Sequence, residues 1–403
     1  MQAPVEHVAR KNLTGKAVDP PLALPAQFAA GDGCALIAPE EIDAALAGEW
    51  GALAALASEP NPFAEHWFVA PGIGAFPPNG GMRLAVVRRG ARLAGILPLF
   101  IERDYGRARI AHVENWRHPN MFLGTPLVRS GEEEPFWRAL IETLDGTSWA
   151  RGFLHVDGLA EDGPVHRGLK AASAALGRRA PVVYRERRAL LEAGLSPEQY
   201  LKRNLRKKRR DEFKRLRKRL GECGRLETRE LGQAEEIGPW CQEFLRLEAA
   251  GWKGRAGSAL ACCPSAADFF RRAVAGAFAA GRLHFLRLDL DRRPIAMLTG
   301  FLAPPGAFGF KTAFDEAFAR FSPGVLLQLD YLAMLERPGI EWTDSCAGET
   351  HPTASLWSGR RSVVRITLRL KGMRRGAAYL AARALEQGAT GLARFQAGRQ
   401  ARR

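Results

Sequence analysis

The segment from Arg320 to Leu326 reads Arg-Phe-Ser-Pro-Gly-Val-Leu and has the most specific chemical pattern in the sequence. Serine at an N-cap followed by proline at the first helical position is a strong helix-start signal. The free N–H groups at such a start, at the positive end of the helix dipole, bind phosphate. A capped helix without a ligand has the same pattern and stays an alternative. The predicted anion-binding residues are Arg320, Ser322, Pro323, Gly324, Val325 and Leu326.

Two groups that could act as a general base accompany the strand expected at 340–344. Asp344 ends this strand, and His351 lies in the loop after it. A carboxylate or an imidazole at the C-terminal edge of a strand faces the crevice in which α/β proteins bind ligands, where it can accept a proton. The alternative is that Asp344 caps the turn after the strand.

Lysine is rare outside the basic segments, and this makes two positions stand out. Of the 59 lysines and arginines only 11 are lysine, and Lys253 and Lys311 are the only ones between residues 220 and 370. Where arginine is the usual cation, a lysine favours a site that needs a compact or deprotonatable amine. We therefore expect Lys311 to be a catalytic or acceptor-binding group and Lys253 to bind substrate. Ordinary surface lysines are the alternative.

Four further residues are candidates for substrate contact, because they lie near these lysines or at the matching crevice of the first half. They are Trp252, Asp315, His118 and Asn120. The sequence has no Gly-x-Ser-x-Gly elbow, no Walker or Gly-x-Gly-x-x-Gly loop, and no cysteine or histidine at zinc-ligand spacing. We therefore expect no hydrolase triad and no bound metal.

An internal repetition defines the elements that must position these residues. Hairpins are expected at 84–100 and 283–301, each preceded by two helical stretches and followed by a loop, a helix and a strand. Two copies of this unit predict an α/β protein with two similar lobes. The expected segments are a poorly ordered tail (1–35), a first lobe (36–194), a second lobe that opens with a basic helix (195–371) and a basic tail (372–403).

The positive charge is concentrated in two segments. The whole chain carries +16, whereas residues 202–219 have twelve cations against two anions and residues 360–403 have twelve against one. The remainder is therefore mildly acidic. The first segment is compatible with a helix and predicts an anionic partner, such as a nucleotide-linked substrate, RNA or a membrane surface. A solvated linker helix is the alternative.

Composition limits the class of protein. The chain has 403 residues, 46% hydrophobic and 25% charged, which excludes wholesale disorder and fibrous folds. No apolar run approaches the roughly 18 residues of a membrane span, and the N-terminus lacks the apolar core of a signal peptide. We expect a cytoplasmic location, with peripheral contact to the inner face of the membrane as an option.

Three segments together resemble a known family. Asn61-Pro-Phe, the stretch from Phe244 to Gly254, and the stretch from Lys311 to Leu327 are similar to the CelD-type branch of GNAT acyltransferases. That branch is associated with cellulose and exopolysaccharide biosynthesis and is similar to the Fem aminoacyltransferases of peptidoglycan. The resemblance implies two tandem GNAT-like lobes, each with a mixed, mostly antiparallel sheet flanked by helices. It also implies a degenerate first lobe and an acyl-donor site in the second.

The same resemblance implies a donor and a reaction. The turn from Arg320 to Leu326 corresponds to the GNAT pyrophosphate loop, in which only Arg320 and Gly324 match and their spacing differs. Acetyl-CoA or another acyl-CoA is then the co-substrate, and the acceptor is an amine or hydroxyl of a sugar or peptide. One alternative is a tRNA-dependent aminoacyltransferase with RNA on the basic helix. The other is a non-catalytic protein that binds nucleic acid or a membrane surface.

Overall fold

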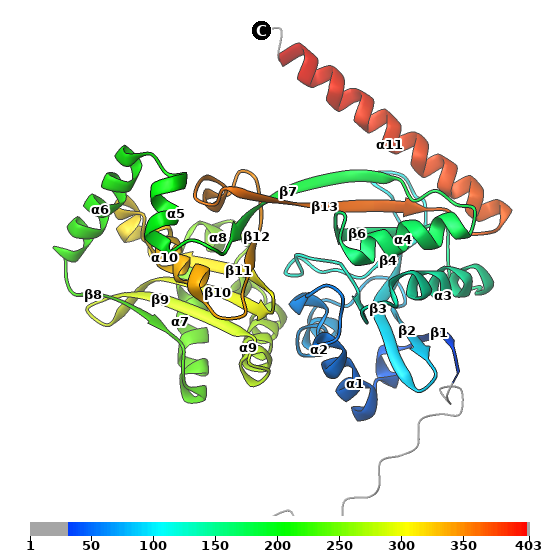
Figure 1. Ribbon diagram of the computed structural model, residues 1–403, viewed down its shortest axis with the longest axis horizontal. Coiled ribbons are helices and arrows are strands. Elements are labelled where there is room, and N and C mark those ends of the chain that lie inside the picture. The colour runs from blue at the N-terminus through cyan, green and yellow to red at the C-terminus, as the bar shows by residue number, and fades with distance from the viewer. Residues whose placement is uncertain (1–30, 401–403) are drawn as a thin grey trace, which may run out of the picture.

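The computed structural model describes the backbone of residues 31–400 and the side chains of residues 31–388. One sheet runs through two lobes, and helices flank it (Figure 1). The α/β fold expected from the sequence is therefore confirmed. The elements of the first half are β1 (Gly33–Ile37), α1 (Ala44–Ala54), α2 (His66–Ala75), β2 (Arg83–Arg89), β3 (Arg92–Glu102), β4 (His112–Asn115), β5 (Leu127–Val128), α3 (Glu133–Gly146), β6 (Leu154–Ala160), α4 (Pro164–Ala175) and β7 (Val182–Glu192).

The second half repeats this plan after two basic helices. Its elements include three 3₁₀ helices that matter for the site: η6 (Glu316–Phe321), η7 (Tyr331–Glu336) and η8 (Pro352–Ser355). The helices and strands are α5 (Pro197–Asn204), α6 (Lys207–Gly221), β8 (Leu226–Glu230), α7 (Ile237–Ala250), α8 (Trp252–Arg255), α9 (Pro264–Ala279), β9 (Leu283–Leu290), β10 (Arg293–Ala303), β11 (Gly306–Phe314), α10 (Pro323–Asp330), β12 (Trp342–Gly348), β13 (Gly359–Leu368) and α11 (Met373–Gln400).

The sheet has 13 strands in the order β1-β2-β3-β4-β6-β13-β7-β12-β11-β10-β9-β8, with β5 on β3. Most neighbours are antiparallel. The parallel pairs are β4 with β6 in the first half and β11 with β12 in the second. Each parallel pair is connected through a helix, α3 or α10, as a parallel connection requires. The two halves therefore place equivalent crevices at β4/β6 and at β11/β12.

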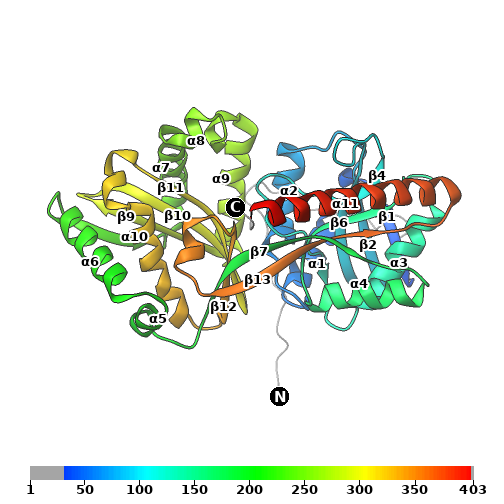
Figure 2. The ribbon, with the colours of Figure 1, turned by 90° about the horizontal axis from the view of Figure 1, so that it is seen from above.

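The two halves exchange a strand at the centre of the sheet. β7, which ends the first half, pairs with β12 of the second, and β13, which ends the second half, pairs with β6 of the first. β7 and β13 also pair with each other along most of their length, and Figure 2 shows them running side by side between the lobes. The lobe boundary at 194/195 stays a prediction. The backbone hydrogen bonds of β7 with β12 and of β13 with β6 connect residues on its two sides.

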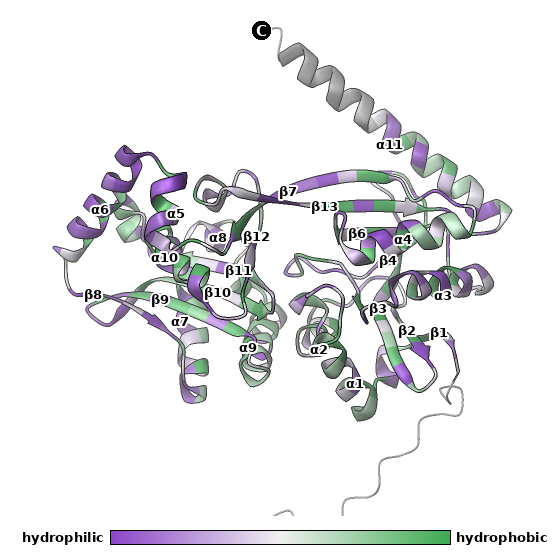
Figure 3. Ribbon diagram, viewed as in Figure 1, coloured by the Kyte–Doolittle hydropathy of each residue, from purple (hydrophilic) through white to green (hydrophobic). Residues whose placement is uncertain are grey.

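Two details differ from the expectations. The tail was expected to reach residue 35, but β1 begins at Gly33 and pairs with β2; residues 1–30 lie outside the described part of the chain. The helix expected over 202–219 is two helices, α5 and α6, because Leu205 takes an extended conformation and buries its side chain. The strongly hydrophilic α6 stands out in Figure 3. The basic segment after residue 372, for which the sequence allowed a frayed helix or a basic tail, forms the helix α11 over its described residues.

Aromatic side chains join the lobes behind the second-half crevice. The Phe63 ring lies 6.0 Å from the Phe308 ring, and the Phe68 ring lies 5.2 Å from the Phe269 ring. Edge-on aromatic pairs of this kind add stability beyond the area they bury. The lobes therefore share a packed core.

Candidate functional site

A cavity of about 590 Å³ lies where β11 and β12 separate, beneath α10. Its walls come from β10, β11, β12, α8, α10 and the segments around η6 and η8, with one residue, Phe122, from the first half. The lining residues are Phe122, Trp252, Lys253, Leu298, Thr299, Gly309, Phe310, Lys311, Thr312, Phe314, Ala319, Ser322, Gly324, Val325, Gln328, Tyr331, Ser345, Cys346, Ala347, His351, Pro352 and Leu356. This volume suits a small-molecule ligand.

The cavity exists because the parallel pairing of β11 with β12 is short. It covers Gly306–Phe308 opposite Trp342–Asp344 and then stops. At the next position a side chain on Gly309 would lie 2.8 Å from the Ser345 carbonyl oxygen. Beyond this contact the strands separate. On the β12 side the Cys346 and Ala347 N–H groups already donate to Asp344 Oδ1 (2.8 Å) and Ser345 Oγ (3.4 Å), so a ligand here would lie between the strands without extending the β12 ladder.

A β-bulge aims two neighbouring side chains into the cavity. Thr299 of β10 pairs with Lys311 and Gly300 pairs with Gly309, so Phe310 is the extra residue. Successive side chains of a regular strand point to opposite faces, and a bulge removes that alternation. Both Phe310 and Lys311 therefore line the cavity.

The start of α10 forms one end of the cavity. Ser322 has a left-handed backbone (φ 53°), and its carbonyl accepts the N–H groups of Val325 (2.9 Å) and Leu326 (3.0 Å). The Gly324 N–H has no hydrogen-bond partner within the described residues. The helix begins at Pro323 as expected, but the Ser322 side chain does not cap it. The left-handed backbone is the physical reason, because an N-cap side chain reaches the next turn from extended geometry.

The predicted anion-binding residues divide into two groups. Ser322, Gly324 and Val325 line the cavity, whereas Pro323 and Leu326 are buried outside its lining. Arg320 is exposed, also outside the lining, with its guanidinium 4.7 Å from the centre of the Phe321 ring.

Lys311 is the cation with the fewest contacts in the cavity. Its Nζ lies 5.7 Å from the centre of the Phe122 ring and 5.8 Å from that of Phe310, and it has no hydrogen-bond or ion-pair partner within the described residues. Burial lowers the pKa of Lys311 to about 8; the nearby Glu248 carboxylate opposes this shift, and the Lys253 ammonium adds to it. An appreciable fraction of this amine is therefore neutral near physiological pH.

Lys253, in contrast, is fully engaged. Its Nζ donates to Glu248 Oε1 (2.9 Å) and to the Thr312 carbonyl (3.2 Å), and Glu248 Oε2 accepts the Leu260 N–H (2.8 Å). The Glu248 side chain is almost completely buried, so this pair fixes α8 against β11. Trp252 lines the same wall but is 57% exposed.

His351 lines the cavity with a defined tautomer. Its Nδ1 accepts the Thr353 N–H (3.3 Å) and lies 2.8 Å from Thr353 Oγ1. A backbone N–H can only donate, so in the neutral ring the proton is on Nε2. Burial lowers the pKa of His351, with Lys253 adding to the effect, which favours the neutral ring. His351 can therefore donate through Nε2–H, but the neutral ring cannot accept a proton there.

Asp344 does not line the cavity. Its side chain is completely buried; Oδ1 accepts the Cys346 N–H (2.8 Å) and Oδ2 lies 3.4 Å from Arg361 Nη1. Oδ1 therefore holds the irregular segment of β12 that follows Asp344, and Oδ2 pairs with Arg361 of β13. The sequence alternative, a structural Asp344 that caps the local backbone, describes the Oδ1 contact. In this arrangement the carboxylate cannot reach a ligand in the cavity.

The other three candidates for substrate contact also lie elsewhere. Asp315 caps η6 through the Ala317 N–H (3.0 Å) and pairs with Arg293 (2.7 Å). The His118 ring is stacked on Phe76 (4.5 Å) in the core between the lobes, and burial lowers its pKa to about 3. Asn120 is buried beside it and donates its N–H to His118 Nδ1 (3.3 Å).

Sequence reasoning missed several lining residues. Gln328 and Tyr331 follow Gly324 at four and seven positions, and this helical spacing could have identified them. Phe122 comes from the other lobe, and Cys346 has a left-handed backbone (φ 52°). No local sequence pattern identifies either residue as part of the site. The described residues that line the cavity include no carboxylate. Lys253 is paired with Glu248, so Lys311 is the lining cation without an ion-pair partner among the described residues.

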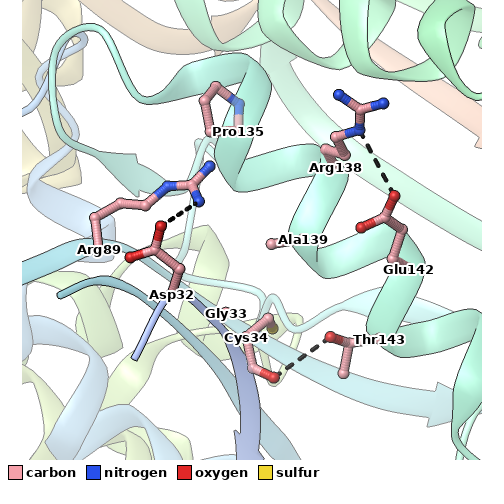
Figure 4. Close-up of a pocket in the computed structure, with 9 residues that line it drawn as sticks. All are labelled: Asp32, Gly33, Cys34, Arg89, Pro135, Arg138, Ala139, Glu142 and Thr143. Atoms are coloured by element: carbon pink, nitrogen blue, oxygen red, sulfur yellow. Dashed lines mark hydrogen bonds and ion pairs between the residues drawn. The ribbon is translucent and has the colours of Figure 1, made fainter. Parts of the chain in front are cut away.

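A second cavity, of about 440 Å³, lies between β1 and α3 in the first half (Figure 4). Its charged groups pair with one another: Arg89 with Asp32 (3.3 Å), and Arg138 with Glu142 (3.6 Å). Thr143 Oγ1 donates to the Cys34 carbonyl (3.3 Å). This cavity therefore offers a ligand few free polar groups.

Within the described part of the chain, no cluster of three or more histidine, cysteine, aspartate or glutamate side chains could hold a metal ion. Among the same residues no helix has both the length and the apolar character needed to cross a bilayer.

Comparison with known proteins agrees with this geometry. Residues 207–351 match the family model described as an acetyltransferase (GNAT) domain. No curated protein matches the chain. The matched segment, residues 207–351, contains β8 to β12 and most of the residues that line the cavity.

Solved structures show a similar fold over nearly the whole chain. FemX has 9% identity and a TM-score of 0.54, covering 83% of this chain and 98% of its own. The C-terminal domain of a putative lysylphosphatidylglycerol synthetase from Agrobacterium fabrum has 12% identity and a TM-score of 0.52, covering 83% and 95%. A conserved protein of unknown function from Bacteroides thetaiotaomicron has 13% identity and a TM-score of 0.50, covering 81% and 97%. These structures share the fold of this chain, and residues 207–351 within it match the model of a GNAT acetyltransferase domain.

Proposed function

We propose that the protein is a GNAT-type acyltransferase that moves an acyl group from an acyl-CoA to an amine or hydroxyl of a sugar or peptide. The observation that carries the proposal is the cavity between the separated ends of β11 and β12. It has an unpartnered Gly324 N–H at one end and no carboxylate in its described lining. A diphosphate would bind at Ser322 and Gly324, and the amide-containing arm of the donor would lie between the separated strands.

Lys311 is the strongest candidate for the proton acceptor. Its amine faces the cavity without a partner among the described residues and has a pKa of about 8, whereas Asp344 is committed to Arg361 and the next turn. In the transfer, the acceptor attacks the thioester carbonyl, the C–S bond breaks and the departing sulfur takes up a proton. Neutral Lys311 accepts the proton that the acceptor loses and can return it to the sulfur. His351 Nε2–H is a donor for the developing oxyanion.

The test is calorimetric titration of the full chain with acetyl-CoA at moderate salt. Saturable binding of one molecule per chain is the expected result. A tenfold loss of affinity in Val325→Glu but not in Val325→Gln would place the diphosphate at α10, because these substitutions differ chiefly in charge. Absence of binding by acetyl-CoA and by longer acyl-CoAs would refute the proposal.

A second candidate function is tRNA-dependent aminoacyl transfer, and the exposed surface of α5 and α6 favours it. Several cations there have no acidic partner within the described residues, among them Arg203, Lys208 and Lys214. RNA binding at this surface would weaken steeply as salt rises, because phosphate contacts release counterions. A flat dependence of affinity on salt would remove this candidate.

Four narrower expectations stay predictions: membership of the CelD-type branch, a role in exopolysaccharide biosynthesis, a cytoplasmic location, and contact with a membrane surface. Each needs a measurement of its own. The acceptor is best sought by incubating the protein with a labelled acyl-CoA and a panel of amino sugars, glycans and peptides.

A further inference from the structure

The solvent side of α11 is apolar over the part of the helix whose side chains the structure describes. Nine residues in the range 373–388 are exposed, and among these nine only Arg374 and Gln387 are polar. A surface helix normally turns its polar face to solvent and its apolar face to the core, so this helix is reversed. Three of the seven large hydrophobic side chains exposed in the described part of the chain lie on it: Met373 (92%), Leu380 (68%) and Leu385 (46%).

Polar contacts fix the opposite side of α11 on the body of the protein. The Arg375 guanidinium donates to the Leu144 carbonyl (3.0 Å) and to the Ala150 carbonyl (3.0 Å). One helical stretch later, Glu386 accepts a hydrogen bond from Thr367 Oγ1 of β13 (2.7 Å). Because both ends of this stretch are held through polar side chains, the helix cannot rotate to bury its apolar side.

The exposed apolar residues form one continuous stripe. Met373, Ala377, Leu380 and Ala384 follow one another at intervals of four, three and four residues, which places them on one side of a helix. We call these four residues the apolar stripe; it runs for about 16 Å along the axis, with Leu385 at its margin. Figure 1 shows α11 at the outer side of the molecule, beyond β13. Exposed apolar surface of this kind marks an interaction site.

A cluster of unpaired cations accompanies the first turn of α11. The segments that supply it meet at Asp145, whose carboxylate accepts the Lys371 N–H (2.7 Å) and pairs with Arg178, and Arg178 also donates to the Arg369 carbonyl (3.1 Å). The charge of Asp145 is therefore already balanced. The cation cluster consists of five exposed residues without an acidic partner among the described residues: Arg151, Arg179, Arg369, Lys371 and Arg374.

The combination of stripe and cluster selects the kind of partner. A second copy of α11 would cover the stripe but would bring no carboxylate to the cations, because Glu386 is bonded inward to Thr367. RNA would supply phosphates for the cations, yet an exposed aliphatic stripe gains nothing from a phosphate backbone. The surface of an anionic bilayer offers both a negative charge and an apolar layer directly beneath it.

We propose that α11 lies on the surface of a bilayer that contains anionic lipids. The apolar stripe enters the boundary between headgroups and acyl chains, and the cation cluster contacts the headgroups. This inference goes beyond the proposed function and does not depend on it. It also distinguishes α11 from α6, which has many cations but none of the large hydrophobic side chains exposed in the described part of the chain.

Co-sedimentation of the full chain with vesicles tests the proposal. We expect binding to phosphatidylcholine vesicles that contain phosphatidylglycerol, and much weaker binding to vesicles of phosphatidylcholine alone. The double variant Met373→Ser, Leu380→Ser should lower the partition coefficient about tenfold or more, because two large apolar side chains no longer enter the lipid. Leu56→Ser, at a hydrophobic residue that is 48% exposed elsewhere on the surface, is the matched control and should bind like the unchanged chain.

A second pair of variants tests the charges. Lys371→Gln combined with Arg374→Gln should lower the partition coefficient about tenfold, since each cation near an anionic surface contributes to binding. Lys208→Gln combined with Lys214→Gln removes the same charge from α6 and should leave binding nearly unchanged. All the substituted residues are exposed, apart from the alanines of the stripe that stay in place, so the unfolding temperature of each variant should match that of the unchanged chain.

Four results would overturn the proposal. The first is absence of binding to the phosphatidylglycerol vesicles, and the second is equal binding to neutral vesicles. The third is binding that the α6 variant weakens and the α11 variants do not, which would assign the membrane contact to α6. The fourth is a dimer in light scattering without lipid that dissociates in the variant of Met373 and Leu380, which would assign the stripe to a second copy of the chain.

Discussion

The crevices at β4/β6 and β11/β12 occupy equivalent places in the two halves, yet only the second forms the cavity described above. In the first half the Asn115 side chain bridges the strands: its Nδ2 donates to the Asp157 carbonyl (2.9 Å), and its Oδ1 accepts the Asp157 N–H (2.7 Å). The Gly124 N–H donates to the Gly158 carbonyl (2.9 Å) in the same place. Protein groups thus take the hydrogen bonds that the second half leaves to a ligand.

The helices at the two crevices differ in charge as well. The first turn of α3 contains Glu133 and Glu134, whereas the first turn of α10 contains no acidic residue. Acidic residues stabilise a helix start and repel an anionic ligand from it. In the first half, side-chain hydrogen bonds close the space between the parallel strands and stabilise the fold. In the second half, the equivalent strands leave a cavity that a ligand can occupy. The variants below test this difference, starting with the largest expected effect.

Removing the Lys311 amine should have the largest effect. Lys311→Met keeps the length of the side chain, and we expect kcat to fall about 100-fold or more because the proton acceptor is lost. In the unchanged chain the rate should rise with pH and level off above about 8, since the neutral amine is the active form and the pKa of Lys311 is about 8. The variant should lose this rise.

Steady-state kinetics between pH 6 and 9 measure both effects. Lys170→Met, at an exposed lysine of α4, serves as the control and should keep the rate and its pH profile. A Lys311→Met enzyme that retains the same pH profile would exclude Lys311 as the base.

Opening the crevice of the first half should cost stability. Asn115→Leu removes the bridge between β4 and β6 and leaves the Asp157 N–H without its partner, so we expect a loss of about 2 kcal/mol. Denaturant unfolding of the variant measures this loss. Acetyl-CoA affinity should stay unchanged. A large loss of affinity would show that the first half contributes to the donor site.

Making α10 resemble α3 should weaken donor binding. Val325→Glu places a carboxylate at the cavity wall near Gly324, and we expect the Kd for acetyl-CoA to rise about tenfold relative to Val325→Gln. The difference should shrink at high salt, because ions screen exposed charges. Equal Kd values for the two variants at low salt would place the diphosphate elsewhere.

Arg320→Ala should have the smallest effect. The guanidinium is exposed and rests on the Phe321 ring, so its attraction to a bound diphosphate acts through solvent. We expect KM for the donor to rise about threefold with kcat nearly unchanged, since exposed charge pairs contribute under about 1 kcal/mol. An unchanged KM would exclude Arg320 from donor binding.

The sequence was most informative where function follows from local pattern. The repeated hairpins, the helix start at Pro323 and the unusual lysine at position 311 were readable, because periodicity, proline and residue choice are local properties. The contacts that decide the role of each candidate were not readable. His351 has its Nδ1 occupied by Thr353, and Asp344 turns inward to Arg361. The His118 ring lies among aromatic residues from distant segments.

The sequence by itself determined the class of fold, the repeated plan and the neighbourhood of the site, since alternating strands, helix signals and turns are encoded over short stretches. The resemblance placed the donor site in the second lobe, and only the tertiary structure gave the physical reason, which is the Asn115 bridge that closes the first crevice. The tertiary structure also decided the exchange of β7 and β13 between the halves. The physical reason is that hydrogen-bond satisfaction and burial depend on partners far away in the chain, and no local pattern specifies those partners.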